Sequence, residues 1–208
     1  MIIKTFVEGP ISANNYLLID ENSKEAVLID CSSSREEFIN AVKAEQVKLK
    51  YILLTHGHFD HILGCDKFKE VFSPEIYMNE KDKIQVELAS SMASYYSGTN
   101  TQEIKSISNY IKNGDELTFG GIKIKAISTP GHTEGGMCYL IDGKLFSGDT
   151  LFKGSVGRCD LQGGNWKELL KSIREKVFIL PDDSEVYPGH GPKTTIEYEK
   201  QYNEILNI

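Results

Sequence analysis

Residues 55–61, THGHFDH, constrain the possible folds of this chain more than any other stretch. Three of the five histidines in its 208 residues lie here, together with an aspartate. Protonated imidazoles this close would repel one another, so the cluster is favourable where a bound cation keeps the rings neutral. The run KLKYILLTH at 48–56 predicts a buried strand that runs straight into the cluster. The fold must therefore hold a loop of potential ligands at the carboxyl end of this strand.

The spacing within the loop favours two metal ions rather than one. His56 and His58 point the same way in an extended segment, because side chains alternate along it. The turn that follows gives Asp60 and His61 a different direction. Each pair could serve one ion, and paired divalent cations are a known device for activating a hydroxide and clamping a substrate. Four ligands divided between two ions leave both ions incompletely coordinated, so further ligands are needed elsewhere.

The remaining histidines lie where such ligands would be expected. His132 occurs in TPGHT and His190 in YPGH, and each follows a predicted strand and a Pro-Gly turn. Asp149, in FSGDT, also ends a predicted strand. Taken alone, His132 or His190 could equally be an ordinary surface or hydrogen-bonded histidine. Together with the cluster, they predict a metal site built from strand ends.

Apolar runs and alternating patterns predict the secondary structure. Strands are predicted over 2–7, 15–20, 25–30, 48–56, 75–80, 116–119, 122–129, 137–142, 144–149 and 185–190. Helices are predicted over 62–72, 81–96, 165–180 and 194–206, and a further helix to Gln46 begins at a capping box of Ser34 and Glu37. The two halves mix hairpins with helices and lack the strict alternation of a doubly wound sheet. We therefore expect an α+β fold, with two mixed β-sheets packed face to face and helices outside, in a single domain over residues 1–208.

Composition excludes several functional classes. The net charge of −7 and the pI near 5.3 provide no positive field for nucleic acid. The first residues show no secretion signal and no run reaches membrane-spanning length, so we expect a cytoplasmic protein without a membrane partner. The four cysteines are scattered singly, which predicts thiols rather than disulfides.

The motifs together resemble those of the metallo-β-lactamase superfamily. Its signature H-x-H-x-D-H is matched at residues 56–61, and TPGHT, SGDT and PGHGP follow in the family's order, so the resemblance spans essentially the whole chain. It implies a four-layer αββα sandwich with metals at one edge. It also implies the ligands: His56, His58 and His132 for the first ion, Asp60, His61 and His190 for the second, and Asp149 bridging the two. The cofactors would be two divalent ions, with zinc as the first choice and iron or manganese as alternatives.

Two aspartates receive further roles from the resemblance. Asp60 would be catalytic, because it would help orient a hydroxide held between the two ions. Asp30 ends its strand and resembles the family's aspartate near the site, where it would orient the ligand loop. The alternative for Asp30 is a strand-end aspartate that caps a turn.

Other residues narrow the branch of the family. Asp149 stands where some β-lactamases use a cysteine ligand, which argues against that branch. His58 stands where the flavin-linked diiron branch has glutamate, which argues against that branch too. The stretch SGDTLFKGSVGRCD resembles hydroxyacylglutathione hydrolase (glyoxalase II) and its short relatives. That resemblance implies that Arg158 meets a carboxylate of the glutathione moiety, which a guanidinium can bind in bidentate fashion. Pairing of Arg158 with Asp160 or a loop carbonyl is the alternative.

The predicted function is a metal-dependent thioesterase of the glyoxalase II-like type. Its substrate would be a small-molecule acyl thioester or ester, and a thiolate leaves without prior protonation because a thiol pKa is about 8.5. Only eighteen residues follow His190, fewer than the glutathione-binding region of full-length members would need, so glutathione specificity stays open. The alternatives are a persulfide dioxygenase with one non-haem iron on His56, His132 and Asp149, and a lactonase or other ester hydrolase.

Overall fold

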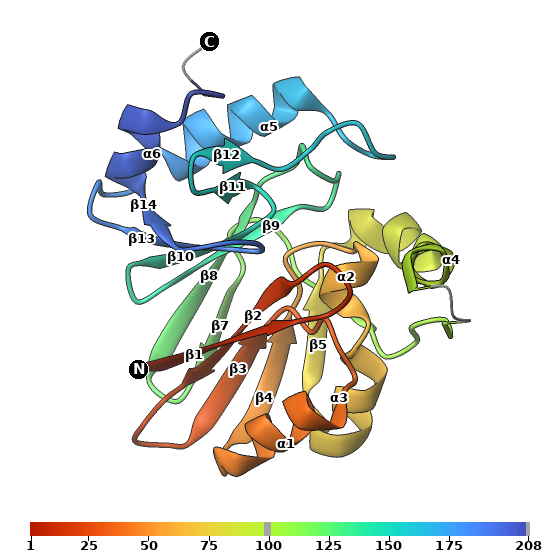
Figure 1. Cartoon of the computed structure of the whole chain (residues 1–208). Coiled ribbons are helices and arrows are strands. Elements are labelled where there is room, and N and C mark those ends of the chain that lie inside the picture. Colours follow the sequence, from red (N-terminus) through yellow and green to blue (C-terminus); the bar gives the residue numbers. More distant parts are fainter. Residues whose placement is uncertain (98–100, 207–208) are drawn as a thin grey trace. The chain divides into compact units, whose positions relative to one another are not determined.

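A computed structural model describes residues 1–97 and 101–206 of the chain (Figure 1). The chain forms two compact units. Unit 1 comprises Met1–Ile111 and Thr118–Ile122, and unit 2 comprises Lys112–Leu117 and Lys123–Ile208. Each unit contains most or all of one six-stranded mixed sheet together with helices, so the α+β class predicted from the sequence is confirmed. The single domain over residues 1–208 stays a prediction.

The sheet of unit 1 has the order β1-β2-β3-β4-β5-β6. The first three strands are antiparallel, and β3 to β6 run parallel to one another. Parallel neighbours end at the same edge of a sheet, so the residues after β3 and β4 lie together. The strands are β1 (Ile2–Glu8), β2 (Ala13–Ile19), β3 (Glu25–Ile29), β4 (Lys48–Leu53), β5 (Glu75–Met78) and β6 (Asn109–Tyr110).

Helices of unit 1 share one buried apolar cluster with the sheet. Phe38 of α1, Phe68 of α3 and Ala89 of α4 contribute to it together with alternate residues of the strands. This is the pattern expected where helices cover one sheet face. The helical elements are α1 (Glu36–Ala44), α2 (Phe59–Ile62), α3 (Cys65–Phe72), the 3-10 turn η1 (Glu80–Asp82) and α4 (Lys83–Ser97).

Two predictions about these helices are wrong. The N-cap of α1 is Arg35, which makes no side-chain cap, so the capping box from Ser34 does not form. The helix predicted over 62–72 is divided at Gly64, whose N–H donates to the Cys31 carbonyl. A β-carbon at Gly64 would come within 2.3 Å of the Ser33 carbonyl oxygen, so close packing against the segment after β3 fixes this break.

The sheet of unit 2 has the order β14-β13-β10-β9-β8-β7. β10 is parallel to β13 and antiparallel to β9, which in turn is antiparallel to β8. β8, β10 and β13 therefore run in one direction and end at the same sheet edge. The strands are β7 (Glu116–Phe119), β8 (Ile122–Ser128), β9 (Met137–Ile141), β10 (Lys144–Gly148), β13 (Glu185–Pro188) and β14 (Thr194–Thr195).

A small hairpin and two helical segments complete unit 2. The hairpin joins β11 (Leu151–Phe152) to β12 (Ser155–Val156). Helix α5 (Trp166–Ser172) continues into the π-helical turn η2 (Ile173–Val177), and α6 spans Ile196–Tyr202. Leu169, Ile173 and Val177 line the core side of the first segment. All four cysteines of the chain are free thiols, as predicted. Among the residues that the structure describes, none of the helices has the length and apolar character to cross a membrane.

Candidate metal centre

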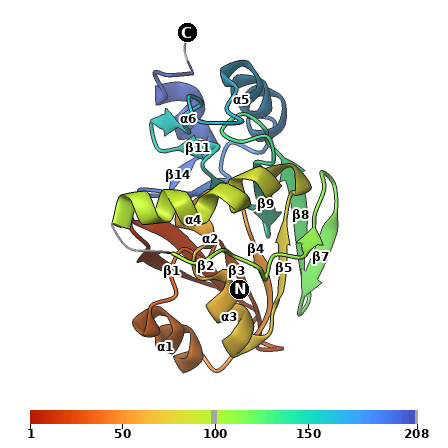
Figure 2. The same cartoon turned by 90° about the vertical axis from the view of Figure 1, so that its right-hand side faces the viewer.

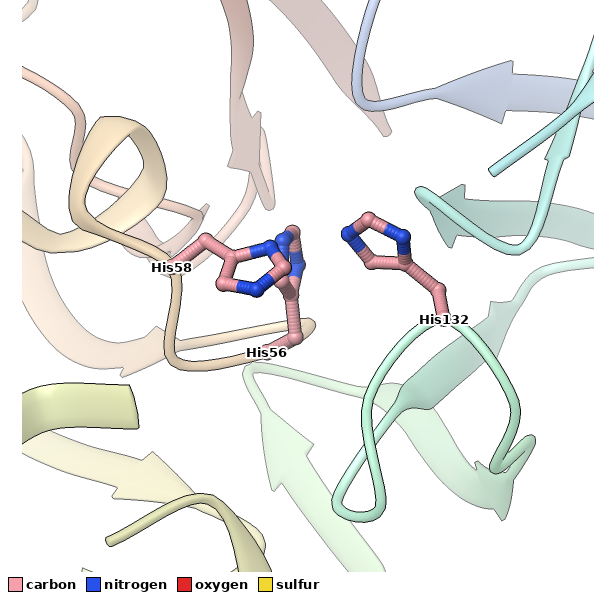
Figure 3. A group of neighbouring side chains, drawn as sticks. All are labelled: His56, His58 and His132. Carbon is pink, nitrogen blue, oxygen red and sulfur yellow. The ribbon is translucent and has the colours of Figure 1, made fainter. Parts of the chain in front are cut away.

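The ligand loop of unit 1 begins where β4 ends. His56 and His58 extend from it with ring centroids 4.8 Å apart and planes 84° apart, and Figure 3 shows both rings on the same side of the loop. His58 occupies the N-cap position of α2, and the short helix then carries Asp60 and His61. His61 is fully buried and its ring centroid lies 4.2 Å from that of His56. The strand end and the helical turn thus gather all four predicted ligands of this loop.

Asp30 holds the rings of two of these histidines. Its Oδ2 accepts hydrogen bonds from His61 Nδ1 and from Thr55 Oγ1, both at 2.8 Å. Because Thr55 Oγ1 donates to Asp30, it is an acceptor for His56 Nδ1, 3.1 Å away. The Thr55 N–H donates to the other oxygen of Asp30 at 2.7 Å. Both rings therefore use Nδ1 for hydrogen bonding and have Nε2 to offer as a ligand atom.

Asp60 lies next to Nε2 of His61, the ring nitrogen that could bind a metal ion. The His61 Nε2 and Asp60 Oδ2 atoms are 3.2 Å apart, and Asp60 is buried. A buried carboxylate is unfavourable without compensating charge or hydrogen bonds. A cation shared with His61 would supply such compensation.

In unit 2, two histidines lie close to the carboxylate of Asp149. His132 follows β8 and donates from Nδ1 to the carbonyl oxygen of Arg158 at 2.7 Å. Its Nε2 lies 3.6 Å from Asp149 Oδ2, and His190 Nε2 lies 3.7 Å from that same oxygen. Figure 3 shows His132 on the loop after β8. The parallel direction of β8, β10 and β13 explains why these three residues meet at one edge.

A glycine lets the segment after β12 approach this edge. A β-carbon at Gly157 would lie 1.9 Å from the Asp149 carbonyl oxygen and 3.0 Å from His132 Nδ1. Only a residue without a side chain fits between them. This packing brings the Arg158 carbonyl to His132, a contact that the sequence did not reveal.

The Arg158 side chain binds Asp160. Its Nε and one terminal nitrogen donate to the two carboxylate oxygens at 2.7 and 2.8 Å, and both side chains are exposed. The hydrogen bond from Arg158 lowers the pKa of Asp160 to about 2. Arg158 therefore pairs with Asp160, which is one of the alternatives predicted from the sequence. A substrate role for Arg158 stays a prediction.

The side chains fit divalent metal ions in type and spacing. Two ligand atoms about 2.1 Å from one tetrahedral ion lie roughly 3.4 Å apart. The separations of 3.2, 3.6 and 3.7 Å within the units are close to that value. Within residues 1–97 and 101–206, the side chains that could hold a metal ion are the seven predicted from the sequence: His56, His58, Asp60, His61, His132, Asp149 and His190. Imidazole and carboxylate donors suit zinc, iron and manganese.

Comparison of the sequence with known proteins gives one consistent result. The sequence model of the Metallo-beta-lactamase superfamily matches residues 9–190. The chain is 42% identical to an uncharacterized protein of Aquifex aeolicus over 216 residues, which cover all of both chains. It is 35% identical to the probable metallo-hydrolase YqgX of Bacillus subtilis, over 96% of this chain and 94% of that protein. It is also 35% identical to the hydroxyacylglutathione hydrolase GloC of Haemophilus influenzae, over 95% and 96% of the two chains.

Solved structures show the same similarity. The crystal structure of the BLEG-1 B3 metallo-beta-lactamase matches with a TM-score of 0.91 and 37% identity, covering all of both chains. The crystal structure of TTHA1623 in a di-iron-bound form matches with a TM-score of 0.88 and 31% identity, covering 98% of this chain and all of that one. The similarity in fold therefore extends over the whole length of the chain.

Proposed function

Because this chain belongs to the metallo-β-lactamase superfamily, we propose that it is a metal-dependent hydrolase that cleaves acyl thioesters. The proposed centre combines the ligands of both units. His56, His58 and His132 would hold one divalent ion, Asp60, His61 and His190 would hold a second, and Asp149 would be a ligand shared by the two. Zinc is the proposed metal, with iron and manganese as the alternatives that the same donors accept.

The observation that carries this proposal is the position of Asp149. A single oxygen of its carboxylate lies 3.6 Å from the Nε2 of His132 and 3.7 Å from the Nε2 of His190. In the proposed centre these two histidines belong to different ions. An oxygen at ligand spacing from both is what a bridging carboxylate requires.

The protein residues have distinct tasks in the proposed reaction. Bound metal ions lower the pKa of a water molecule and polarise a carbonyl group. Asp30 and the Arg158 carbonyl fix ring orientations by accepting the Nδ1 protons of His61 and His132. Asp60, next to His61 Nε2, orients the attacking water. The thiolate leaving group needs no proton donor, because a thiol pKa is about 8.5.

Similarity to GloC supports a glutathione thioester as the first substrate to test. In that case Arg158 binds a substrate carboxylate and releases Asp160, since one guanidinium fork accommodates one carboxylate at a time. A persulfide dioxygenase reaction is the second candidate, because the imidazole and carboxylate donors of the proposed site also suit a single non-haem iron. It would need one iron on His56, His132 and Asp149.

Thioester hydrolysis by metal-loaded protein tests the proposal. An acylglutathione and the same acyl group on a small uncharged thiol are compared by the release of free thiol. We expect hydrolysis that disappears after chelation and returns with added zinc, iron or manganese. Oxygen uptake on glutathione persulfide without thioester hydrolysis would replace the proposal with the dioxygenase.

A further inference from the structure

Asp82 is a buried carboxylate directly beside the ligand loop. It is the last residue of η1, and its side chain is 0% exposed. Its Oδ2 accepts a hydrogen bond from the Gly57 N–H at 2.9 Å. Gly57 separates the predicted ligands His56 and His58. The carboxylate therefore holds the peptide group from which both rings extend.

The hydrogen bond from Gly57 is of the strong kind. A carboxylate that accepts from a backbone N–H forms a charge-assisted bond, about twice as strong as one between neutral groups. Burial increases the penalty for breaking it, because the anion cannot turn to water instead. The orientation of the peptide between His56 and His58 is thus fixed by a side chain 25 positions further along the chain.

Close packing reinforces this contact. A β-carbon at Gly57 would lie 2.9 Å from the Asp82 carbonyl oxygen and 2.9 Å from Gln85 Cβ. The loop therefore rests on the junction between η1 and α4. At the other end of α4, the ring of Tyr96 stacks on Phe59 with centroids 5.2 Å apart and planes 17° apart. Helix α4 therefore supports the loop beside His56 and His58. Figure 2 shows α4 running alongside α2.

We propose that Asp82 is a positioning residue of the metal centre, which sets the direction of His56 and His58 through the Gly57 peptide. The inference rests on the metal-binding part of the proposed function and not on the thioester substrate. The groups that fix a metal-ligating side chain commonly change metal affinity by 10- to 100-fold when removed. Asp82 acts on the backbone between two such side chains, so its removal affects both.

The test compares Asp82→Ala with Asp82→Asn. Asparagine keeps an oxygen that can accept from Gly57, whereas alanine removes the acceptor. Asp66→Asn is the control, because Asp66 also accepts backbone N–H groups, but from Lys105 and Ser106 rather than from the ligand loop. Zinc affinity is measured by chelator competition, ligand geometry by the visible spectrum of the cobalt-substituted protein, and folding by circular dichroism and thermal unfolding of metal-free protein.

We expect Asp82→Ala to lose affinity by about tenfold or more and to change the cobalt spectrum. Asp82→Asn should lose less affinity than Asp82→Ala, because its neutral amide oxygen still accepts from Gly57, although more weakly than a carboxylate, and Asp66→Asn should be unchanged. A folded Asp82→Ala variant with wild-type affinity would overturn the inference, as would equal losses of affinity in the two Asp82 variants.

If Asp82→Ala does not fold, the same measurements are made on Gly57→Ala, because the added β-carbon displaces the same peptide group. An unaltered zinc affinity and cobalt spectrum in that variant would then contradict the inference. Tight metal binding without thioesterase activity would reject only the proposed substrate, while a wild-type chain that binds no metal would overturn both proposals.

Discussion

The carboxylate of Asp30 is linked by hydrogen bonds to two histidines of the ligand loop, to one directly and to the other through Thr55. Its Oδ2 accepts from His61 directly and from His56 through the hydroxyl of Thr55. The residue adopts a positive φ of 59°, a conformation that aspartate tolerates better than most residues. The sequence placed Asp30 at a strand end near the site. Its link to His56 depends on the register between β3 and β4, and the motif alone does not reveal it.

We predict that Asp30→Asn lowers metal affinity by about 10- to 100-fold. The amide can keep the bond from the Thr55 N–H, but an NH2 group in place of Oδ2 cannot accept from His61 or from the Thr55 hydroxyl. Asp20→Asn is a matched control, because Asp20 is another strand-end aspartate that binds only its own turn through Ser23 among the bonds described. Chelator competition measures both variants. Equal affinity in Asp30→Asn and the wild type would show that the rings are oriented by other contacts.

The ion pair between Arg158 and Asp160 depends on pH. The pKa of Asp160 is depressed to about 2, so its carboxylate stays charged, and the pair complete, until the pH falls through that value. Across neutral pH a substrate carboxylate that binds Arg158 as proposed would therefore have to displace Asp160. Asp160→Asn should lower KM for an acylglutathione by up to about fivefold without changing kcat, because exposed ion pairs are weak. Arg158→Ala should raise KM for the same substrate, and an unchanged KM in both variants would exclude Arg158 from substrate binding.

Among the elements, α6 stabilises the β11–β12 hairpin through one buried side chain. Glu199 is fully buried and accepts from the Gly154 N–H, the Thr194 hydroxyl and the Asn203 amide. Glu199→Ala leaves buried donors without this acceptor, which costs about 1–3 kcal/mol of unfolding free energy. The thermal midpoint should fall by several degrees. Glu197→Ala, at an exposed position on the same helix, should leave the midpoint unchanged. Equal midpoints for the two variants would show that Glu199 does not stabilise the hairpin.

Elements with a clear local pattern were predictable from the sequence. Apolar runs such as KLKYILL identified the long strands, and the histidine and aspartate motifs lie at strand ends as expected. The two-residue strands β6, β11, β12 and β14 were missed, because backbone pairing with a neighbouring strand defines them and two residues are too few to show an alternating pattern. The break at Gly64 and the π-helical turn after α5 were missed as well. At Gly64 the cause is packing against Ser33, a tertiary contact that no local pattern encodes.

For the whole molecule, the predicted ligands are divided between unit 1 and unit 2. A ligand that binds only the folded state stabilises that state by RT ln(1 + [L]/Kd). This is about 2.7 kcal/mol when the free ligand concentration is a hundred times Kd. Removing metal with a chelator should therefore lower the thermal midpoint, and restoring zinc should recover it. Differential scanning calorimetry at matched ionic strength measures the change. A midpoint that is the same with and without metal would contradict metal binding by the native chain.

The metal content of the purified protein distinguishes a two-metal centre from a site for a single ion. Elemental analysis of wild-type chain saturated with zinc and freed of excess metal should give about two ions per chain. His190→Ala should retain about one, because it removes a ligand of the second ion and leaves His56, His58 and His132 intact. Both proteins must be folded by circular dichroism for the comparison to count. One ion or none in the wild type, or two ions in the His190→Ala variant, would contradict the two-metal centre.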